Sequence, residues 1–306
     1  MKPLISICIP TYNRIKYLTE GLNSIVNQFG DKNIYKKVEI VICNDDSIDD
    51  TKEIVKTYLR KYKNIRYFEN TRNIGFAKNQ LKVAGFAAGN YIWFLSDDDI
   101  HKNGSLKSVF QVIQKYDPDV ILCNLDLYSK DLQHVIDKNL LRLSHDKFIT
   151  RKKDLFSYLE KKFFLPFDWY IGVYSNTIIK RSIVNRHAAK LKQFDGQPNP
   201  FPHSSLFYYF PDDYKIYLLS ESVIKFRSDN QSFGPNDKKQ FLVYMYRILN
   251  MHYDNICRKN AKNISSKFKI LIFLKKTSRA IRLFLLKLIN KDIERVLISL
   301  FYKRTT

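Results

Sequence analysis

The stretch that decides the fold reads Tyr91-Ile92-Trp93-Phe94-Leu95-Ser96-Asp97-Asp98-Asp99. Its first five residues are apolar or aromatic and follow Gly89-Asn90, which indicates a short strand buried on both faces. Three aspartates come directly after that strand. Neighbouring carboxylates repel one another, so a divalent cation would stabilise them, and oxygen-only ligands suit Mg²⁺ or Mn²⁺. The same aspartates also fit a solvated turn that caps a helix starting near Lys102.

The segments on both sides of this stretch alternate strictly between strands and helices. Besides 91–95, the apolar runs predict strands at 4–9, 38–43, 65–68 and 120–125. Helical spacing predicts helices at 15–29, around 54–59, at 76–88 and at 104–116. This alternation predicts an α/β fold with a mostly parallel sheet that is flanked by helices.

A second acidic cluster, Asn44 to Thr51, follows the strand at 38–43. Ligands of parallel sheets bind beyond the carboxyl ends of the strands, so Asp45 and Asp97–Asp99 should meet in one crevice. Asp45 is the residue that we assign to the ligand, as an acceptor for a base N–H or a ribose hydroxyl. Asp49 is assigned to capping the next helix, and capping would also explain the cluster by itself.

The remainder of the chain is less regular. We expect one domain over 1–235, with its first half at 1–125 and its second half at 126–235. Within the second half we expect a helix near 153–162, a strand near 170–179, a helix near 203–210, and one or two strands near 216–226. A basic, amphipathic helical region is expected at 236–306.

Composition limits the classes of protein. The chain has 306 residues and a formal net charge of +22, which calls for an anionic partner. Residues 258–306 hold 14 lysines and arginines against two acids, so +12 of that charge belongs to the last 49 residues. Four cysteines without C-x-x-C spacing favour buried thiols in a reducing compartment. We expect neither a signal peptide nor a membrane-spanning helix.

Four motifs in this order resemble family 2 of the glycosyltransferases, which have the GT-A fold. They are Ser6 to Arg14 (SICIPTYNR), Ile42 to Thr51 (ICNDDSIDDT), Asn73 to Asn79 (NIGFAKN) and Ala88 to Asp99 (AGNYIWFLSDDD). The match covers about residues 4–125. It implies that 1–235 is a catalytic domain, with a nucleotide-sugar-binding half at 1–125 and an acceptor-binding half at 126–235. The chain looks like the abequosyltransferase-like branch, whose enzymes act in O-antigen and surface-polysaccharide assembly.

The resemblance implies roles for individual residues. Asp45 would read the nucleobase, Asp97 would contact the ribose, and Asp98 and Asp99 would bind Mn²⁺ or Mg²⁺. The other residues expected around the nucleotide sugar are Pro10, Thr11, Tyr12, Arg14, Arg72, Asn73 and Lys78. Arg72 and Lys78 equally fit solvated surface positions.

The sequence departs from the family pattern in two places. Asn44 replaces the first of two usual acids, and no Glu-Asp pair provides the usual general base. The segment 199–206 occupies the place of that pair, so we expect His203 or Asp168 to be the base. Asp195, Asp212 and Asp213 are weaker candidates.

The resulting interpretation is a hexosyl- or deoxyhexosyltransferase that works by an inverting single displacement. The expected donor is a UDP-, GDP-, CDP- or dTDP-sugar, and the expected acceptor is a lipid-linked glycan. The basic C-terminal helices would hold the protein on the cytoplasmic face of the inner membrane. The alternatives are a nucleotidyltransferase and a catalytically inactive nucleotide- or nucleic-acid-binding protein. No nucleic-acid-binding signature is present, and the aspartates would repel a phosphate backbone without a metal.

Overall fold

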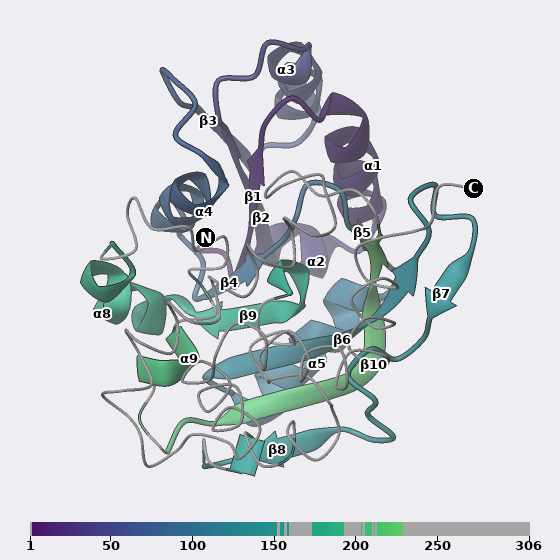
Figure 1. Cartoon of the computed structure of the whole chain (residues 1–306), viewed down its shortest axis with the longest axis vertical. Helices are drawn as coiled ribbons and strands as arrows, with labels where there is room; N and C mark the ends of the chain where they lie inside the picture. Colours follow the sequence, from purple (N-terminus) through teal and green to yellow (C-terminus); the bar gives the residue numbers. More distant parts are fainter. Residues whose placement is uncertain are drawn as a thin grey trace, which may run out of the picture.

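The computed structural model describes residues 2–151, 154, 155, 158, 173–192, 203, 206–209, 211 and 213–228. Within these residues a single sheet of ten strands forms the centre of the molecule (Figure 1). Its main path runs β3-β2-β1-β4-β9-β6-β10-β5, while β7 pairs with β6 and β8 pairs with β10. The strands are β1 Ile5–Thr11, β2 Val38–Asn44, β3 Ile65–Glu69, β4 Tyr91–Phe94, β5 Ile100–His101, β6 Val120–Tyr128, β7 Val135–Asp137, β8 Lys147–Ile149, β9 Thr177–Lys180 and β10 Ile216–Arg227.

Helices cover both faces of the sheet. The helices are α1 Ile15–Val26, α2 Lys32–Lys37, α3 Thr51–Lys61, α4 Phe76–Gly85, α5 Ser105–Tyr116, α8 Arg181–Lys192 and α9 Leu206–Tyr209, and a 3₁₀ turn covers Tyr174–Asn176. One apolar cluster joins α1, α2, α3 and α5 to the sheet, and a second joins α4, α8 and α9 to its other face (Figure 1). Strand β1 supplies Ile7 and Ile9 to the first cluster and Cys8 to the second, as the two-residue period of a strand requires.

The helices form because their apolar residues recur on one side. In α1 the buried residues Leu18, Leu22 and Ile25 follow a spacing of four and three, which places them on a single stripe facing the sheet. Helix α4 starts after Gly75, whose φ of +85° is readily available only to glycine. The helices and strands of the first 125 residues therefore confirm the predicted α/β pattern, but the alternation is not strict: helix α2 follows α1 directly, and the two-residue strand β5 follows β4.

Parallel pairing places three strand ends at one edge. Strands β2 and β4 both pair with β1 in parallel, with Ile7 opposite Ile40 on one side and Trp93 on the other. All three strands therefore point the same way, so Thr11 at the end of β1 comes together with Asp45 and Asp97, which follow β2 and β4, at the carboxyl edge.

The second half of the sheet is more mixed than a simple alternation predicts. Strand β9 lies between β4 and β6 and runs antiparallel to both. It begins 49 positions after β6 ends, so no local pattern places it there. Strand β10 is one strand of 12 residues with irregular register near Ser222, whereas the sequence left one or two strands open.

Several expectations fall on residues that the structure does not describe. They are most of the helix at 153–162, the first part of the segment at 170–179, and the whole region 236–306. Along the described residues, no helix combines the length and the apolar character that crossing a membrane requires.

Candidate active site

Thr11 connects the two acidic clusters at the carboxyl edge of the sheet. Its backbone carbonyl accepts a hydrogen bond from the backbone N–H of Asp45 at 2.9 Å. Its hydroxyl donates to Oδ2 of Asp97 at 2.8 Å. Thr11, Asp45 and Asp97 are all buried. The predicted meeting of Asp45 with the Asp97–Asp99 run therefore takes place through Thr11, the last residue of β1.

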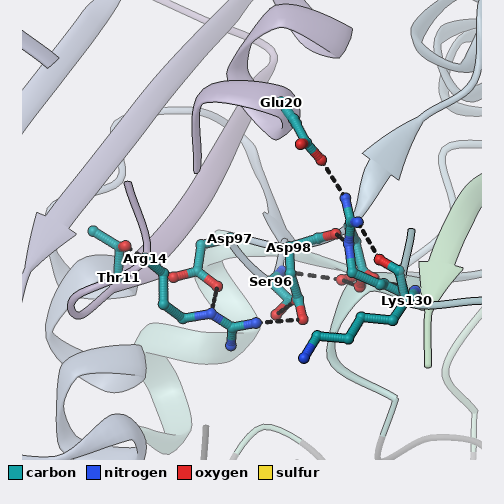
Figure 2. Close-up of polar contacts among 10 residues, drawn as sticks. Thr11, Arg14, Glu20, Ser96, Asp97, Asp98 and Lys130 are labelled. Carbon is teal, nitrogen blue, oxygen red and sulfur yellow. Dashed lines mark hydrogen bonds and ion pairs between the residues drawn. The ribbon is translucent and has the colours of Figure 1, made fainter. Parts of the chain in front are cut away.

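Arg14 provides the positive charge nearest to the aspartates. Its Nη2 lies 2.7 Å from Oδ2 of Asp98, and its Nε lies 3.5 Å from Oδ1 of Asp97, as Figure 2 shows. Burial lowers the pKa of the Arg14 guanidinium, but the two carboxylates raise that pKa by more. Burial, with repulsion from Asp98, raises the pKa of Asp97 to about 7 against the opposing effects of Arg14 and Thr11.

Asp99 has protein partners for both of its oxygens, and its predicted contact with the metal stays a prediction. One oxygen of its carboxylate accepts a hydrogen bond from the Ser175 hydroxyl, and the other accepts one from the backbone N–H of Arg227 at 3.0 Å. The side chain is completely buried, and burial raises its pKa, as does the charge of Asp98. Asp99 therefore ties the aspartate loop to the 3₁₀ turn before β9 and to the end of β10, whereas Asp97 and Asp98 face Arg14.

Arg227 holds the same loop from the far end of β10. Its side chain is buried, and it donates to the backbone carbonyl of Asp98 at 2.9 Å and to that of Lys130 at 2.5 Å. Its Nη2 also lies 2.5 Å from the carboxylate of Glu20 in α1 (Figure 2). The guanidinium carbons of Arg14 and Arg227 lie 5.1 Å and 4.9 Å from the centre of the Tyr17 ring, so this ring contacts both guanidinium groups.

Asp45 organises the loop in front of α4. Its carboxylate accepts hydrogen bonds from the side-chain amide of Asn70 at 2.7 Å and from the backbone N–H groups of Ile74 and Gly75, each at 2.9 Å. In this conformation the carboxylate orients the loop, so its predicted contact with a nucleobase stays a prediction. Asp49 accepts from the backbone N–H of Thr51, the first residue of α3, at 3.2 Å, and also from that of Ile15 at 3.1 Å. The cap position of α3 itself is taken by Asp50, which makes no side-chain cap hydrogen bond, so the prediction that Asp49 is the cap is corrected.

The other predicted nucleotide-binding residues surround these groups. Pro10 is buried in β1, and Tyr12 exposes 42% of its surface just beyond it. Arg72, Asn73 and Lys78 are exposed, and Asn73 accepts a hydrogen bond from the backbone N–H of Gly75 at 2.9 Å. These exposed positions leave them accessible to a ligand but do not by themselves define a role.

Of the two main candidate bases, His203 and Asp168, the structure describes only His203. His203 has no exposed surface; its Nδ1 lies 3.0 Å from the side-chain nitrogen of Gln80, and its ring contacts Phe94 and Tyr174. A general base must reach the acceptor hydroxyl, so this burial weighs against His203. Asp168, Asp195 and Asp212 lie outside the described residues.

Asp97 and Asp98 fit a divalent cation of the Mg²⁺ or Mn²⁺ type. Two adjacent carboxylates already share one positive group, Arg14, and each has its second oxygen held by a hydroxyl, that of Thr11 or of Ser96. Across the described part of the chain, no three acidic, imidazole or thiol groups converge on one point. A cation here would take few protein ligands and would complete its coordination with phosphate and water oxygens.

Sequence reasoning missed Glu20, Tyr17, Ser175 and Arg227. Arg227 lies 128 positions beyond Asp99, and no spacing rule connects them. The only local signal is a cation at the end of an apolar strand, because a buried charge needs a partner.

Known proteins resemble this chain over most of its length. The family profile described as Glycosyl transferase family 2 matches residues 6–187. Abequosyltransferase RfbV of Salmonella typhimurium is 28% identical over 274 residues, which cover 84% of this chain and 78% of that protein. The glycosyltransferase MG025 of Mycoplasma genitalium is 41% identical over 109 residues, and the chain spans only 36% of its length.

Solved structures share the fold. TarS of S. aureus in complex with UDP-GlcNAc superposes with a TM-score of 0.57 at 17% identity, covering 88% of this chain and 78% of that one. The mannosyltransferase PcManGT of Pyrobaculum calidifontis, solved with GDP-Man and Mn²⁺, gives a TM-score of 0.50 at 14% identity, over 69% of that chain. The profile covers more than half of the chain, and the strand ends carry the polar groups that the motifs predict. This chain therefore belongs to glycosyl transferase family 2 and is a glycosyltransferase with the GT-A fold.

Proposed function

We propose that this glycosyltransferase transfers a sugar from a nucleoside diphosphate sugar to a hydroxyl group of a glycan, with a divalent metal ion bound at Asp98. The observation that carries the proposal is the convergence of Thr11, Arg14, Asp97 and Asp98 at the carboxyl edge of the sheet. Solved relatives bind UDP-GlcNAc and GDP-Man, which supports a nucleotide-sugar donor without selecting its base.

The residues of the chain would divide the reaction as follows. Asp97, fixed by the Thr11 hydroxyl, would accept from the ribose of the donor. Asp98 would hold the metal ion, which when bound offsets the charge that develops on the departing diphosphate. Arg14 would contact the phosphates. The buried bonds from Ser175 and Arg227 to Asp99 keep the loop that carries these carboxylates in place.

We also propose that the reaction is a single displacement with inversion, which requires a base at the acceptor hydroxyl. Because His203 is buried, Asp168 is the stronger of the two candidates. Replacing Asp168 with Asn should abolish transfer while donor binding persists, and replacing His203 with Gln should leave more activity. The opposite order of activities would assign the base to His203, and NMR of the product linkage would determine the stereochemistry.

The acceptor and location belong to the same proposal. The similarity to abequosyltransferase RfbV supports a role in surface-polysaccharide assembly, with a lipid-linked glycan as acceptor. The basic region 258–306 would hold the chain on the cytoplasmic face of the membrane. Replacing Lys275, Lys276, Arg282 and Lys287 with Gln should weaken co-sedimentation with anionic liposomes. Unchanged binding would remove this region from the proposal.

The decisive experiment is donor hydrolysis with Asp98→Asn. Each of the UDP-, GDP-, CDP- and dTDP-sugars is incubated with the protein and Mn²⁺, and release of the nucleoside diphosphate is measured. Wild-type protein should release it slowly from one donor class, and Asp98→Asn should lose this activity. Asp154→Asn is the matched control, because Asp154 pairs with Arg151 on the surface. Equal activity of Asp98→Asn and wild type would refute the metal-dependent mechanism, and a wild type that binds no such nucleotide would favour an inactive protein.

A further inference from the structure

Arg14 faces the same carboxylate oxygens that a metal ion would need. In Asp97, Oδ2 accepts from the Thr11 hydroxyl while Oδ1 faces Nε of Arg14 at 3.5 Å. In Asp98, Oδ1 accepts from the Ser96 hydroxyl at 2.5 Å while Oδ2 faces Nη2 of Arg14 at 2.7 Å. Each carboxylate thus has one oxygen fixed by a hydroxyl and one oxygen directed at the guanidinium.

The arrangement is compact enough for the two cations to exclude each other. The side chain of Arg14 is only 11% exposed, and its guanidinium lies on the ring of Tyr17 at 5.1 Å. A divalent ion binds carboxylate oxygens at about 2.0–2.2 Å, so its centre would lie within a few ångströms of the guanidinium. Two positive groups at that separation in a partly buried site repel strongly. Metal binding alone would therefore require Arg14 to leave the carboxylates.

A nucleoside diphosphate changes this balance. Its phosphates offer Arg14 a planar, bidentate anionic partner and supply oxygen ligands to the metal. We propose that Arg14 is an internal counter-cation, which holds Asp97 and Asp98 in the absence of ligand and moves to the diphosphate when the metal and the nucleotide bind. Because of this exchange, the affinity for the metal depends on the nucleotide. The proposal rests on the proposed function for its second step, while its first step concerns the protein without nucleotide.

The consequence is a measurable coupling between the two ligands. In wild-type protein, Mn²⁺ has to displace Arg14, so its affinity without nucleotide is reduced. If Arg14 becomes uncharged, the carboxylates lose their internal partner and take up Mn²⁺ directly. Because the bonds from Arg14 to the carboxylates are charge-assisted, their loss should raise the affinity for Mn²⁺ roughly tenfold or more. By linkage, the enhancement of Mn²⁺ binding by the nucleotide should be smaller by the same factor in the uncharged variant than in wild type.

The test measures free Mn²⁺ by electron paramagnetic resonance in titrations of the full-length protein, first without any nucleotide. Arg14→Gln and Arg14→Met should each bind Mn²⁺ about tenfold more tightly than wild type. Arg14→Lys, which keeps the charge, should stay close to wild type. Arg60→Gln, on the exposed side of α3, is the matched control and should equal wild type. Circular dichroism establishes that each variant is folded, and either uncharged variant suffices if the other is not.

Repeating the titrations with UDP, GDP, CDP and dTDP separates this inference from the proposed function. The nucleotide that binds should enhance Mn²⁺ affinity more in wild type than in Arg14→Gln. If no nucleoside diphosphate binds to wild type, the proposed function and the transfer of Arg14 both fail, whereas the nucleotide-free result still determines whether Arg14 is the counter-cation. Mn²⁺ affinities of the uncharged variants equal to or below that of wild type would overturn the inference.

Discussion

Replacing Arg227 with Met tests whether the aspartate loop is held by a buried cation. The wild-type side chain donates to the carbonyls of Asp98 and Lys130 and pairs with Glu20. Methionine keeps an apolar side chain at this position but removes all three bonds and the contact of the guanidinium with Tyr17. We therefore expect the variant to lose stability mainly because the buried acceptors lose the guanidinium as a donor and have no water to replace it.

The magnitude follows from how exposed each partner is. A hydrogen bond to a charged group contributes about 1.5–3 kcal/mol, and the carbonyl of Asp98 is buried. The Glu20 side chain is 37% exposed, so its share is discounted to about 0–1 kcal/mol. With the carbonyl of Lys130 included, we expect the free energy of unfolding to fall by about 3–5 kcal/mol, which is the usual range for removing one member of a buried pair.

The assay is urea denaturation at constant pH, followed by far-ultraviolet circular dichroism and by the fluorescence of buried Trp93. Glu20→Gln should lose less than about 1 kcal/mol, since water solvates the partner that remains. Arg151→Met is the matched surface control and should also change little, because Arg151 is 59% exposed. A loss below about 1 kcal/mol in Arg227→Met would refute the conclusion that this arginine holds the loop.

Three further substitutions test other parts of the fold. Gly89→Ala would place a Cβ 2.7 Å from both the backbone nitrogen and the hydroxyl of Ser6, so urea denaturation should show a fall of about 1–3 kcal/mol in the free energy of unfolding. Gly85→Ala is the control, because open space surrounds that position, and it should be neutral or stabilising. Asp45→Asn should cost about 1.5–3 kcal/mol and speed amide exchange at Ile74 and Gly75, whereas Asp46→Asn, at an exposed position with φ of +63°, should change neither. Burial lowers the pKa of His101 to about 3, below its ordinary value near 6.5, so the folded state binds fewer protons than the unfolded state between these values. Its contribution to stability is therefore complete above about pH 6.5 and falls by about 1.4 kcal/mol per pH unit as the pH decreases toward 3. In urea denaturation at several pH values, the free energy of unfolding of His101→Gln should decline less steeply toward acid pH than that of wild type. An equal decline in both proteins would contradict the lowered pKa of His101.

The parts of the site that the sequence predicts are those governed by strand periodicity. Asp45 and Asp97 follow apolar runs of the same kind, and parallel connections carry both runs to the same edge of the sheet. Thr11 ends the strand between them, so its position is implied as well. The bond from its hydroxyl to Asp97 depends on side-chain geometry, which the pattern does not contain.

The parts that the sequence does not predict depend on contacts between distant segments. Strand β9 enters the sheet between β4 and β6 and places Ser175 beside Asp99. Arg227 reaches the same loop only because β10 pairs with β6 along its whole length. Three adjacent aspartates look equivalent in the sequence. The structure separates them because the Ser175 hydroxyl and the backbone of Arg227 occupy Asp99, while Arg14 faces Asp97 and Asp98.

The two arginines near the aspartate loop should therefore have separable effects. The bonds from Arg227 to backbone carbonyls are ones that no metal or nucleotide would replace during the reaction, so its loss should appear in the free energy of unfolding with or without ligands. Arg14 bonds to carboxylates for which a divalent cation is an alternative partner, so its loss should appear mainly in the coupling between Mn²⁺ and the nucleotide. If both substitutions instead lowered stability alike and left that coupling unchanged, the loop would depend on its total positive charge, and the distinction between an anchoring arginine and an exchangeable one would be wrong.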